Sequence, residues 1–170
     1  MDKAAYDSLT VHDHFYLSLG YFTAHWSFAE YALDLCIALV FHSFGGKTIK
    51  RKLPKTLDRK IEFCRLCQDG LPILKGHPLA DLADRFDAIS SKRHTLIHGI
   101  AINWGERAIE MVKIRHTPDM HVEERSSTDP KQIMQLSGDA LSLCTDTMLY
   151  AGRLLRDLEV ADKQAQIQPS

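Results

Sequence analysis

The chain has 170 residues, a length that suits one domain of residues 1–170 with its own hydrophobic core. Apolar residues make up 45% and charged residues 25%, which argues against both a disordered chain and a membrane protein. The formal net charge of −1 excludes a global attraction to nucleic acid, so any nucleic-acid site has to be a local basic patch.

The cysteines and the first residues favour a cytoplasmic location. Each cysteine lies in an apolar, helical-looking stretch, where a free thiol behaves as a small hydrophobe. They are Cys36, Cys64, Cys67 and Cys144. No disulfide framework is expected, and residues 1–10 are too polar for a signal peptide. The most apolar run, residues 31–44, contains Asp34 and His42 and is too short to span a bilayer, so it predicts a buried helix.

Two helices are predicted in the first half of the chain. Residues 8–43 lack proline and carry apolar residues at three- and four-residue steps, which indicates a long helix that ends at Gly45-Gly46. Its expected core residues are Phe15, Leu19, Phe22, Trp26, Ala29, Leu33, Ile37 and Val40. A basic loop over residues 46–54, a second helix over residues 54–68 and a loop over residues 70–78 follow.

The second half mixes helices with β-rich segments. A third helix is predicted over residues 79–98, just before Gly99, with core residues Leu82, Phe86, Ile89, Leu96 and Ile97. Residues 100–102 and 109–114 are β-rich and are separated by a turn at residues 104–107, and residues 120–125 are either a strand or a loop. A last helix runs from residue 129 or 137 to 161, before a polar tail at residues 164–170. Its expected apolar stripe is Leu141, Cys144, Met148, Ala151, Leu155 and Leu158.

Together these elements predict an all-α fold. Amphipathic helices joined by fairly short links form an up-and-down bundle, here of four to five helices. The β-rich residues, about 100–127, are too few for a sheet-based core. We therefore expect them to form a small β-hairpin excursion between the third and last long helices.

The groups best suited to chemistry lie in residues 90–99, Ser-Ser-Lys-Arg-His-Thr-Leu-Ile-His-Gly, which close the third helix. Arg93 offers a planar fork of donors that suits phosphate, and His98 can exchange protons near neutral pH. His94 and His98 are four residues apart, so they share a helix face. Arg93 and His98 are about 140° apart around an ideal helix. They converge only if the helix end loosens or if a second chain brings its own copy alongside.

This segment resembles the signature of HEPN (higher eukaryotes and prokaryotes nucleotide-binding) domains, which is an arginine, a polar residue, three or more residues and a histidine. Here the matching residues are Arg93, His94, Thr95-Leu96-Ile97 and His98. The family commonly carries this motif at the end of the third helix of a bundle, often before a glycine, as here. The resemblance covers about residues 8–161, and the β excursion goes beyond the minimal pattern.

The resemblance implies a metal-independent ribonuclease of a toxin or defence system that uses no cofactor and works as a homodimer. His98 would be the general acid or base, Arg93 would stabilise charge on the phosphate, and His94 would orient these groups or the substrate. The expected ligand is RNA or a nucleotide, with a cognate antitoxin or other partner protein and no membrane. Two alternatives stay open: a non-catalytic HEPN-like module that binds a nucleotide or a protein, and a structural helical adaptor, since Arg and His also suit a helix C-terminus.

Residues 46–60 are basic and contain one acidic residue, Asp58. They either follow an RNA backbone or form a solvated loop and helix start. The candidate substrate-binding residues are Lys50, Arg51, Lys52 and, beside the motif, Lys92. Glu30 lies among apolar residues and needs a partner if it is buried, which makes it a candidate support for Arg93. Asp34 is a second such carboxylate, and the alternative for each is that it points to solvent.

Two further patterns predict no metal or redox site. Cys64 and Cys67 form a lone C-x-x-C pair without further zinc ligands or a thioredoxin-like context, so we expect core cysteines. The remaining histidines show no coherent metal-ligand spacing. His94 and His98 lack the intervening glutamate of H-E-x-x-H metalloproteases, so no metal is expected there.

Overall fold

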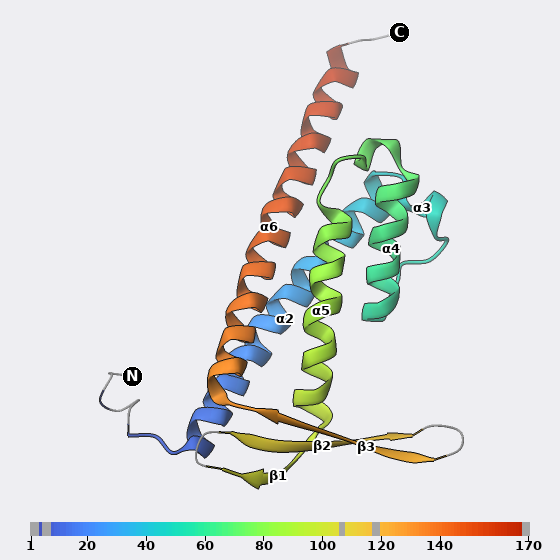
Figure 1. Ribbon diagram of the computed structural model, residues 1–170. Helices are drawn as coiled ribbons and strands as arrows, with labels where there is room; N and C mark the ends of the chain where they lie inside the picture. The colour runs from blue at the N-terminus through green and yellow to red at the C-terminus, as the bar shows by residue number, and fades with distance from the viewer. Residues whose placement is uncertain (1–3, 5–7, 106–107, 117–119, 168–170) are drawn as a thin grey trace. The chain divides into compact units, whose positions relative to one another are not determined.

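The computed structural model describes residues 4, 8–105, 108–116 and 120–167, and it is mainly helical with a small antiparallel sheet (Figure 1). The chain divides into two compact units. Unit 1 comprises Met1–Trp26 and Ile89–Ala140, and unit 2 comprises Ser27–Ala88 and Leu141–Ser170. Three long helices contribute residues to both units, and the single domain over residues 1–170 stays a prediction.

The helices lie close to the predicted ranges. They are α2 (Val11–Ser43), α3 (Gly46–Ile49), α4 (Leu57–Gly70), the 3-10 helix η1 (Pro72–Leu74), α5 (Leu79–His98) and α6 (Pro130–Ile167). The predicted third helix is confirmed at its predicted bounds. The short helix α3 was not predicted. It forms because Gly45, at a φ of 88°, accepts hydrogen bonds from the Thr48 N–H and hydroxyl at 2.9 and 2.8 Å.

Helix α2 is apolar and partly buried. By length and composition alone the whole helix could cross a membrane, since its most apolar 18-residue window has a mean hydropathy of 1.2; the expectation that the run 31–44 is too short to span a bilayer concerns only part of this helix. Core helices of other proteins pass the same test, and 44% of that window is buried inside the protein. The predicted buried helix is confirmed, because most residues of the expected stripe are buried: Phe15, Phe22, Trp26, Ala29, Leu33, Ile37 and Val40.

Unit 2 is a helical unit with an apolar core. Helices α2, α4, α5 and α6 contribute fully buried side chains to it, among them Leu33, Ile37, Phe63, Phe86, Leu143 and Leu154. The Cys36 thiol donates to the Thr147 carbonyl oxygen at 3.3 Å, which links α2 to α6. Buried apolar area of this kind is the main stabilising contribution to a fold.

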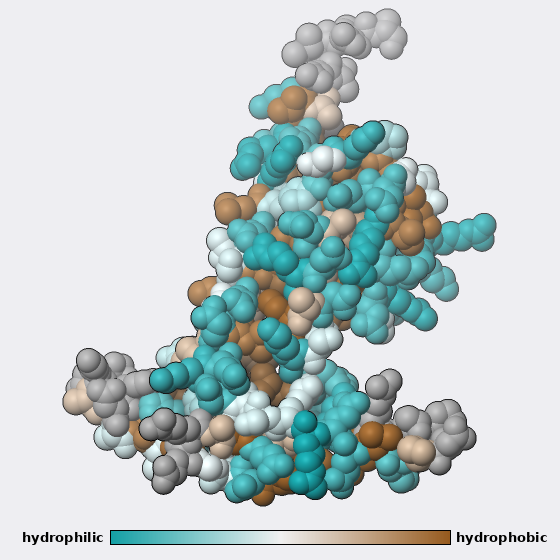
Figure 2. Space-filling view, in the orientation of Figure 1, coloured by the Kyte–Doolittle hydropathy of each residue, from teal (hydrophilic) through white to brown (hydrophobic). Residues whose placement is uncertain are grey.

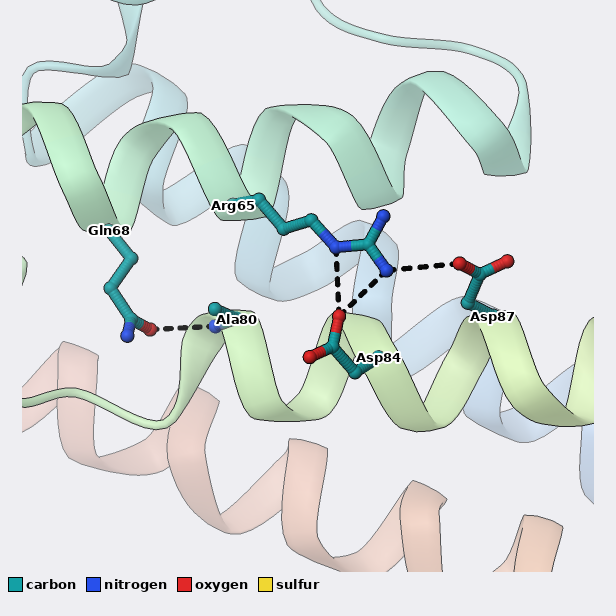
Figure 3. A network of polar contacts seen from close by, with 5 residues as sticks. All are labelled: Arg65, Gln68, Ala80, Asp84 and Asp87. Carbon is teal, nitrogen blue, oxygen red and sulfur yellow. Dashed lines mark hydrogen bonds and ion pairs between the residues drawn. The ribbon is translucent and has the colours of Figure 1, made fainter.

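Polar contacts join α4 to α5 within unit 2. Arg65 of α4 donates to Asp84 at 2.8 Å and to Asp87 at 3.0 Å (Figure 3). One turn further on, the Gln68 side-chain oxygen accepts the Ala80 N–H at 2.7 Å, which satisfies a donor in the first turn of α5 (Figure 3). Hydrophilic residues cover most of the visible face over these two helices in Figure 2.

The predicted stripe on α6 is wrong in part. Leu141, Met148 and Leu155 are 46%, 44% and 45% exposed, whereas Ala151 is buried as predicted. The other buried residues of α6 are Ile133, Leu136, Ala140, Leu143, Tyr150 and Leu154. Apolar residues occupy more than one face of α6, so periodicity alone could not choose the buried face. The polar residue Thr147 is buried too. Its burial is tolerated because its hydroxyl donates a hydrogen bond to the Leu143 carbonyl oxygen at 2.7 Å. On α5, the prediction that Ile97 is a core residue is also wrong, since Ile97 is 38% exposed.

Unit 1 contains a three-stranded antiparallel sheet instead of the predicted hairpin. Its strands are β1 (Ile100–Trp104), β2 (Ile109–His116) and β3 (His121–Thr128), in the order β1–β2–β3. The third strand is therefore confirmed, and the alternative of a loop there is wrong. The turn predicted at residues 104–107 lies partly outside the described residues, and Trp104 itself ends β1.

The sheet is attached to the helices of unit 1 by buried and aromatic residues. Ile109 and Met111 of β2 are buried, whereas β3 is almost entirely exposed. The Trp104 ring lies 4.1 Å from the His12 ring and 5.5 Å from the Phe15 ring, measured between centroids, which joins β1 to the first turns of α2. The sheet is thus held through β1 and β2, and β3 presents a free edge.

Candidate functional site

The end of α5 is a regular helix, and this decides how the motif residues are arranged. The Gly99 N–H donates to the Thr95 carbonyl oxygen at 2.9 Å, so the helical hydrogen bonds continue past His98. The alternative of a loosened helix end is therefore wrong. Within one copy, Arg93 and His98 stay about 140° apart around the helix.

Gly99 is required by space and not by a left-handed backbone. Among the described glycines, only Gly45 and Gly76 have a positive φ. A Cβ on Gly99 would lie 2.5 Å from the Thr95 carbonyl oxygen and 3.1 Å from Met111 Cε. The glycine thus allows the chain to turn from α5 into β1 while it passes close to β2.

Arg93 is held on one face of α5. Its side chain is half-buried, and the guanidinium carbon lies 5.9 Å from the centroid of the Trp26 ring on α2. A guanidinium over an aromatic face gains a cation–π attraction of about 0.5–1 kcal/mol at an exposed site. This contact limits the orientations of the arginine, so that its charge is presented from a defined place.

The two motif histidines lie on another face and are both exposed. Their ring centroids are 4.7 Å apart. Loss of hydration lowers the pKa of His94 below its usual 6.5, and the positive charges of Lys113, His98 and Arg93 lower it further, while Glu124 opposes them. His94 is therefore mostly neutral at pH 7, a state in which one ring nitrogen accepts a hydrogen bond.

A pocket of about 480 Å³ lies on a third face of the end of α5, within unit 1. It is lined by Lys92, Thr95, Leu96, Met111, Ser126, Ser127, Thr128, Gln132, Ile133, Gln135, Leu136 and Asp139. Of these residues, only Lys92 was a candidate binding residue from the sequence. Thr95 and Leu96 also belong to α5, the other lining residues come from β2, β3 and α6, and nothing in the local sequence pattern indicates that these elements meet around a cavity.

The other predicted basic residues belong to unit 2. Lys50 forms an ion pair with Glu62 at 3.0 Å, while Arg51 and Lys52 are exposed. The motif belongs to unit 1. A shared RNA path from these residues to Lys92 stays a prediction.

The two candidate carboxylates differ from each other. Glu30 is half-buried in unit 2, and since Arg93 belongs to unit 1, the pairing of the two stays a prediction. Asp34 is exposed and forms an ion pair with Lys60 of α4. The alternative prediction that Asp34 points to solvent is thus supported. Its ion-pair partner Lys60 was not predicted from the sequence.

The cysteines and histidines show no sign of a metal or redox centre in the part of the chain that the structure describes. No group of three or more His, Cys, Asp or Glu side chains there is arranged to hold a metal ion. Cys64 and Cys67 are fully buried, and burial raises the pKa of the Cys67 thiol to about 12. A thiol that stays protonated at pH 7 is a poor nucleophile and metal ligand, so the expectation of core cysteines is supported.

Comparison of the chain with protein-family models, with curated proteins and with solved structures gives no match. The function of the motif and of the pocket is therefore inferred from the chemistry of their residues.

Proposed function

We propose that this protein is a HEPN-like, metal-independent endoribonuclease of a toxin or defence system, acting in the cytoplasm as a homodimer without a cofactor. In this proposal its helices form the up-and-down bundle of four to five helices expected for such a domain. One observation carries the proposal. At the end of α5, a guanidinium is held against Trp26, and two imidazole rings 4.7 Å apart are left open to solvent.

The chemistry assigns a separate task to each group. His98 acts as general acid or base on the RNA 2′-hydroxyl or the leaving oxygen, a contribution of about 10²–10⁴-fold. Arg93 stabilises the charge that develops on the phosphate, for which one well-placed donor contributes about 2.7–4 kcal/mol. His94, with its lowered pKa, orients the substrate or its partner groups as a neutral ring. No step needs a metal ion.

A second copy completes the site, because one rigid helix end keeps Arg93 and His98 on different faces. Exposed apolar residues support the presence of such a partner. Phe28 and Tyr31 of α2 are 61% and 66% exposed, which is unusual for large aromatic side chains. Hydrophobic side chains are also visible along α6 (Figure 2), where Leu149 is 67% exposed.

RNA binding in this proposal uses positive charges near the motif and beyond it. Lys92 lies one residue before Arg93, and Lys50, Arg51 and Lys52 supply a second group that follows the phosphate backbone. Since each phosphate contact releases a counterion, affinity for RNA should fall steeply as the salt concentration rises. A cognate antitoxin or other partner protein would cover this surface in the inactive state.

The test is cleavage of a mixed RNA in EDTA by wild type, His98→Ala and Arg93→Ala. We expect each variant to lose at least about 10²-fold of the rate. His42→Ala is the matched control, because His42 is an exposed histidine of unit 2 outside the motif, and it should cleave as wild type does. If wild type cuts nothing in EDTA, or if His98→Ala cuts equally well, the catalytic proposal fails.

A negative result is informative when it is paired with a binding measurement. Native mass spectrometry with nucleotides and with co-expressed proteins separates the nuclease from the non-catalytic alternative. Retained binding of RNA or nucleotide without cleavage supports the binding module. A protein that stays monomeric at all concentrations and binds neither nucleotides nor co-expressed proteins contradicts both the nuclease and the binding module.

A further inference from the structure

The pocket of unit 1 has the composition of a small-molecule site. Its volume of about 480 Å³ lies within the range of about 300–1,000 Å³ typical of such sites. Its buried lining residues are apolar: Leu96, Met111, Ile133 and Leu136. Hydroxyl- and amide-bearing residues at five positions of β3 and α6 also line the pocket, which is the usual arrangement for a ligand with one apolar and one polar side.

The polar groups of the pocket differ in how far they are already engaged. Gln132 accepts the Asp129 N–H at 3.2 Å as part of the cap of α6, and the Gln135 side chain donates to the Asp139 carboxylate at 3.1 Å. Because this amide donor is neutral, Asp139 keeps its negative charge, and a bound anion is expected beside Lys92 and away from Asp139. Lys92 forms no ion pair with any residue that the structure describes, and it is the one cationic side chain among the described residues that line the pocket.

Hydroxyl residues of β3 and α5 line part of the pocket. Because successive side chains of a strand point to opposite faces, Ser126 and Thr128 share one face of β3 and Ser127 lies on the other. Thr95 of α5 adds a further hydroxyl. Ser126 pairs with the buried Met111 in the sheet, so it shares the face that covers the pocket. A hydroxyl both donates and accepts, and a set of them therefore suits a ligand with several hydroxyl or ring-nitrogen groups.

We propose that this pocket binds a small phosphorylated compound whose uncharged part is a sugar or a nucleoside. Lys92 contacts the phosphate, since an ammonium is a common point-charge partner of phosphate. The hydroxyl and amide groups bind the polar edge of the sugar or the base. The apolar residues of the pocket pack against its ring. Lys92 is also assigned to RNA binding above, but this proposal does not rest on RNA cleavage, because it concerns the binding of a small compound in the pocket beside Thr95 and Leu96.

The test is titration of the full chain with adenosine 5′-monophosphate, ribose 5-phosphate, adenosine and inorganic phosphate, followed by calorimetry and ligand-observed NMR. We expect the two phosphorylated compounds to bind at least tenfold more tightly than adenosine and than inorganic phosphate. Tighter binding of the nucleotide identifies a nucleoside ligand, and equal binding of the two identifies a sugar phosphate. Equal affinity for adenosine and its monophosphate overturns the proposal, as does the absence of binding by both phosphorylated compounds.

Variants locate the binding. Lys92→Ala should weaken it by about tenfold or more, since it removes the charged partner of the phosphate. Lys131→Ala, an exposed lysine of α6 outside the pocket lining, is the matched control and should bind as wild type does. Ser126→Phe should abolish binding by filling the pocket, and Thr95→Val should weaken it with little change of shape. Binding that survives Ser126→Phe, with the far-UV circular dichroism of a folded chain, places the ligand elsewhere and overturns the proposal.

Discussion

The two units differ in how they use their polar side chains. In unit 2, ion pairs join neighbouring helices: Arg65 of α4 pairs with Asp84 and Asp87 of α5, and Arg85 of α5 pairs with Asp146 of α6 at 2.8 Å. In unit 1, the end of α5 carries an exposed histidine pair and a lysine without an ion pair to any described residue, beside a cavity. Charged groups that are paired within the fold stabilise it, whereas unpaired groups can bind a ligand. Unit 1 is therefore the better candidate for a functional site.

The largest expected effect tests whether the two units unfold together. Phe63 is fully buried in unit 2, and Phe63→Ala should lower the free energy of unfolding by about 3–5 kcal/mol. Both tryptophans, Trp26 and Trp104, belong to unit 1, so their fluorescence reports on that unit alone. Because α2, α5 and α6 each contribute to both units, we expect the fluorescence and circular dichroism transitions in urea to coincide and to shift together.

Separate transitions in this experiment would contradict that expectation. Loss of helical signal at a lower urea concentration than the fluorescence change would mean that unit 1 stays folded without unit 2. The pocket and the motif could then be studied in isolation.

A pair of glycine substitutions sharpens the comparison inside unit 1. Gly99→Ala should destabilise the protein by about 1–3 kcal/mol, because its Cβ would clash with the Thr95 carbonyl oxygen and Met111. Gly20→Ala, inside α2 with nothing within 4 Å of the added Cβ, should stabilise it by about 0.5–1 kcal/mol. Urea denaturation measures both, and an equal sign for the two changes would contradict the close approach at Gly99.

The ion pairs of unit 2 should have smaller effects, since they lie at the surface. Arg65→Ala removes contacts to two aspartates and should lower the stability only slightly, because its side chain is 42% exposed and water screens the charges. A double-mutant cycle with Asp87→Asn isolates one of the two contacts. The coupling should weaken at high salt, and a coupling that is unchanged in about 1 M NaCl would contradict a screened surface pair.

The smallest expected effect is a pH dependence shared by one histidine in each unit. Burial lowers the pKa of His77 in unit 2 below 6.5, with a contribution from Arg153, and the pKa of His94 in unit 1 is lowered as well. The folded state therefore binds fewer protons than the unfolded chain between the lowered pKa and 6.5. The contribution of these lowered pKa values to the free energy of unfolding is fully present above about pH 6.5 and is lost as the pH falls below that value.

The two histidines can be separated by substitution. His77→Gln should reduce the loss of stability between about pH 7 and pH 5 more than His94→Gln does, since His77 is half-buried and bonded to the Tyr150 hydroxyl at 3.2 Å, whereas His94 is exposed. Urea midpoints at several pH values measure this difference. A larger effect of His94→Gln would show that unit 1 shields its charges more than its exposure indicates.

Sequence analysis predicted local structure better than it predicted surroundings. The end of α5 was predicted because Gly99 follows a regular apolar stripe, and α2 was predicted because its core spacing has no interruption. The buried face of α6 was not, because Leu141 and Leu143 are equally apolar and only the neighbouring helices decide which is buried. The pocket was missed for the same reason. Ser126 and Asp139 meet Lys92 only through the strand register and the fold of unit 1.

The motif itself shows the same limit. The order of Arg93, His94 and His98 predicts which chemical groups are present. The pKa of His94, however, is lowered by loss of hydration and by Lys113 of β2, and Glu124 of β3 opposes this shift. The stacking of Arg93 on Trp26 likewise joins α5 to α2. Such long-range neighbours have no signal in the local pattern, so the state of a site cannot be deduced from its motif alone.

The regular end of α5 has a consequence for control. Because the helix keeps Arg93 and His98 about 140° apart, a single copy cannot adjust itself into an active arrangement by a small local motion. For the proposed nuclease, the number of copies that meet then governs the rate. At concentrations well below the dissociation constant of the pair, activity should grow with the square of the protein concentration. A cell could then keep the enzyme silent simply by keeping it scarce.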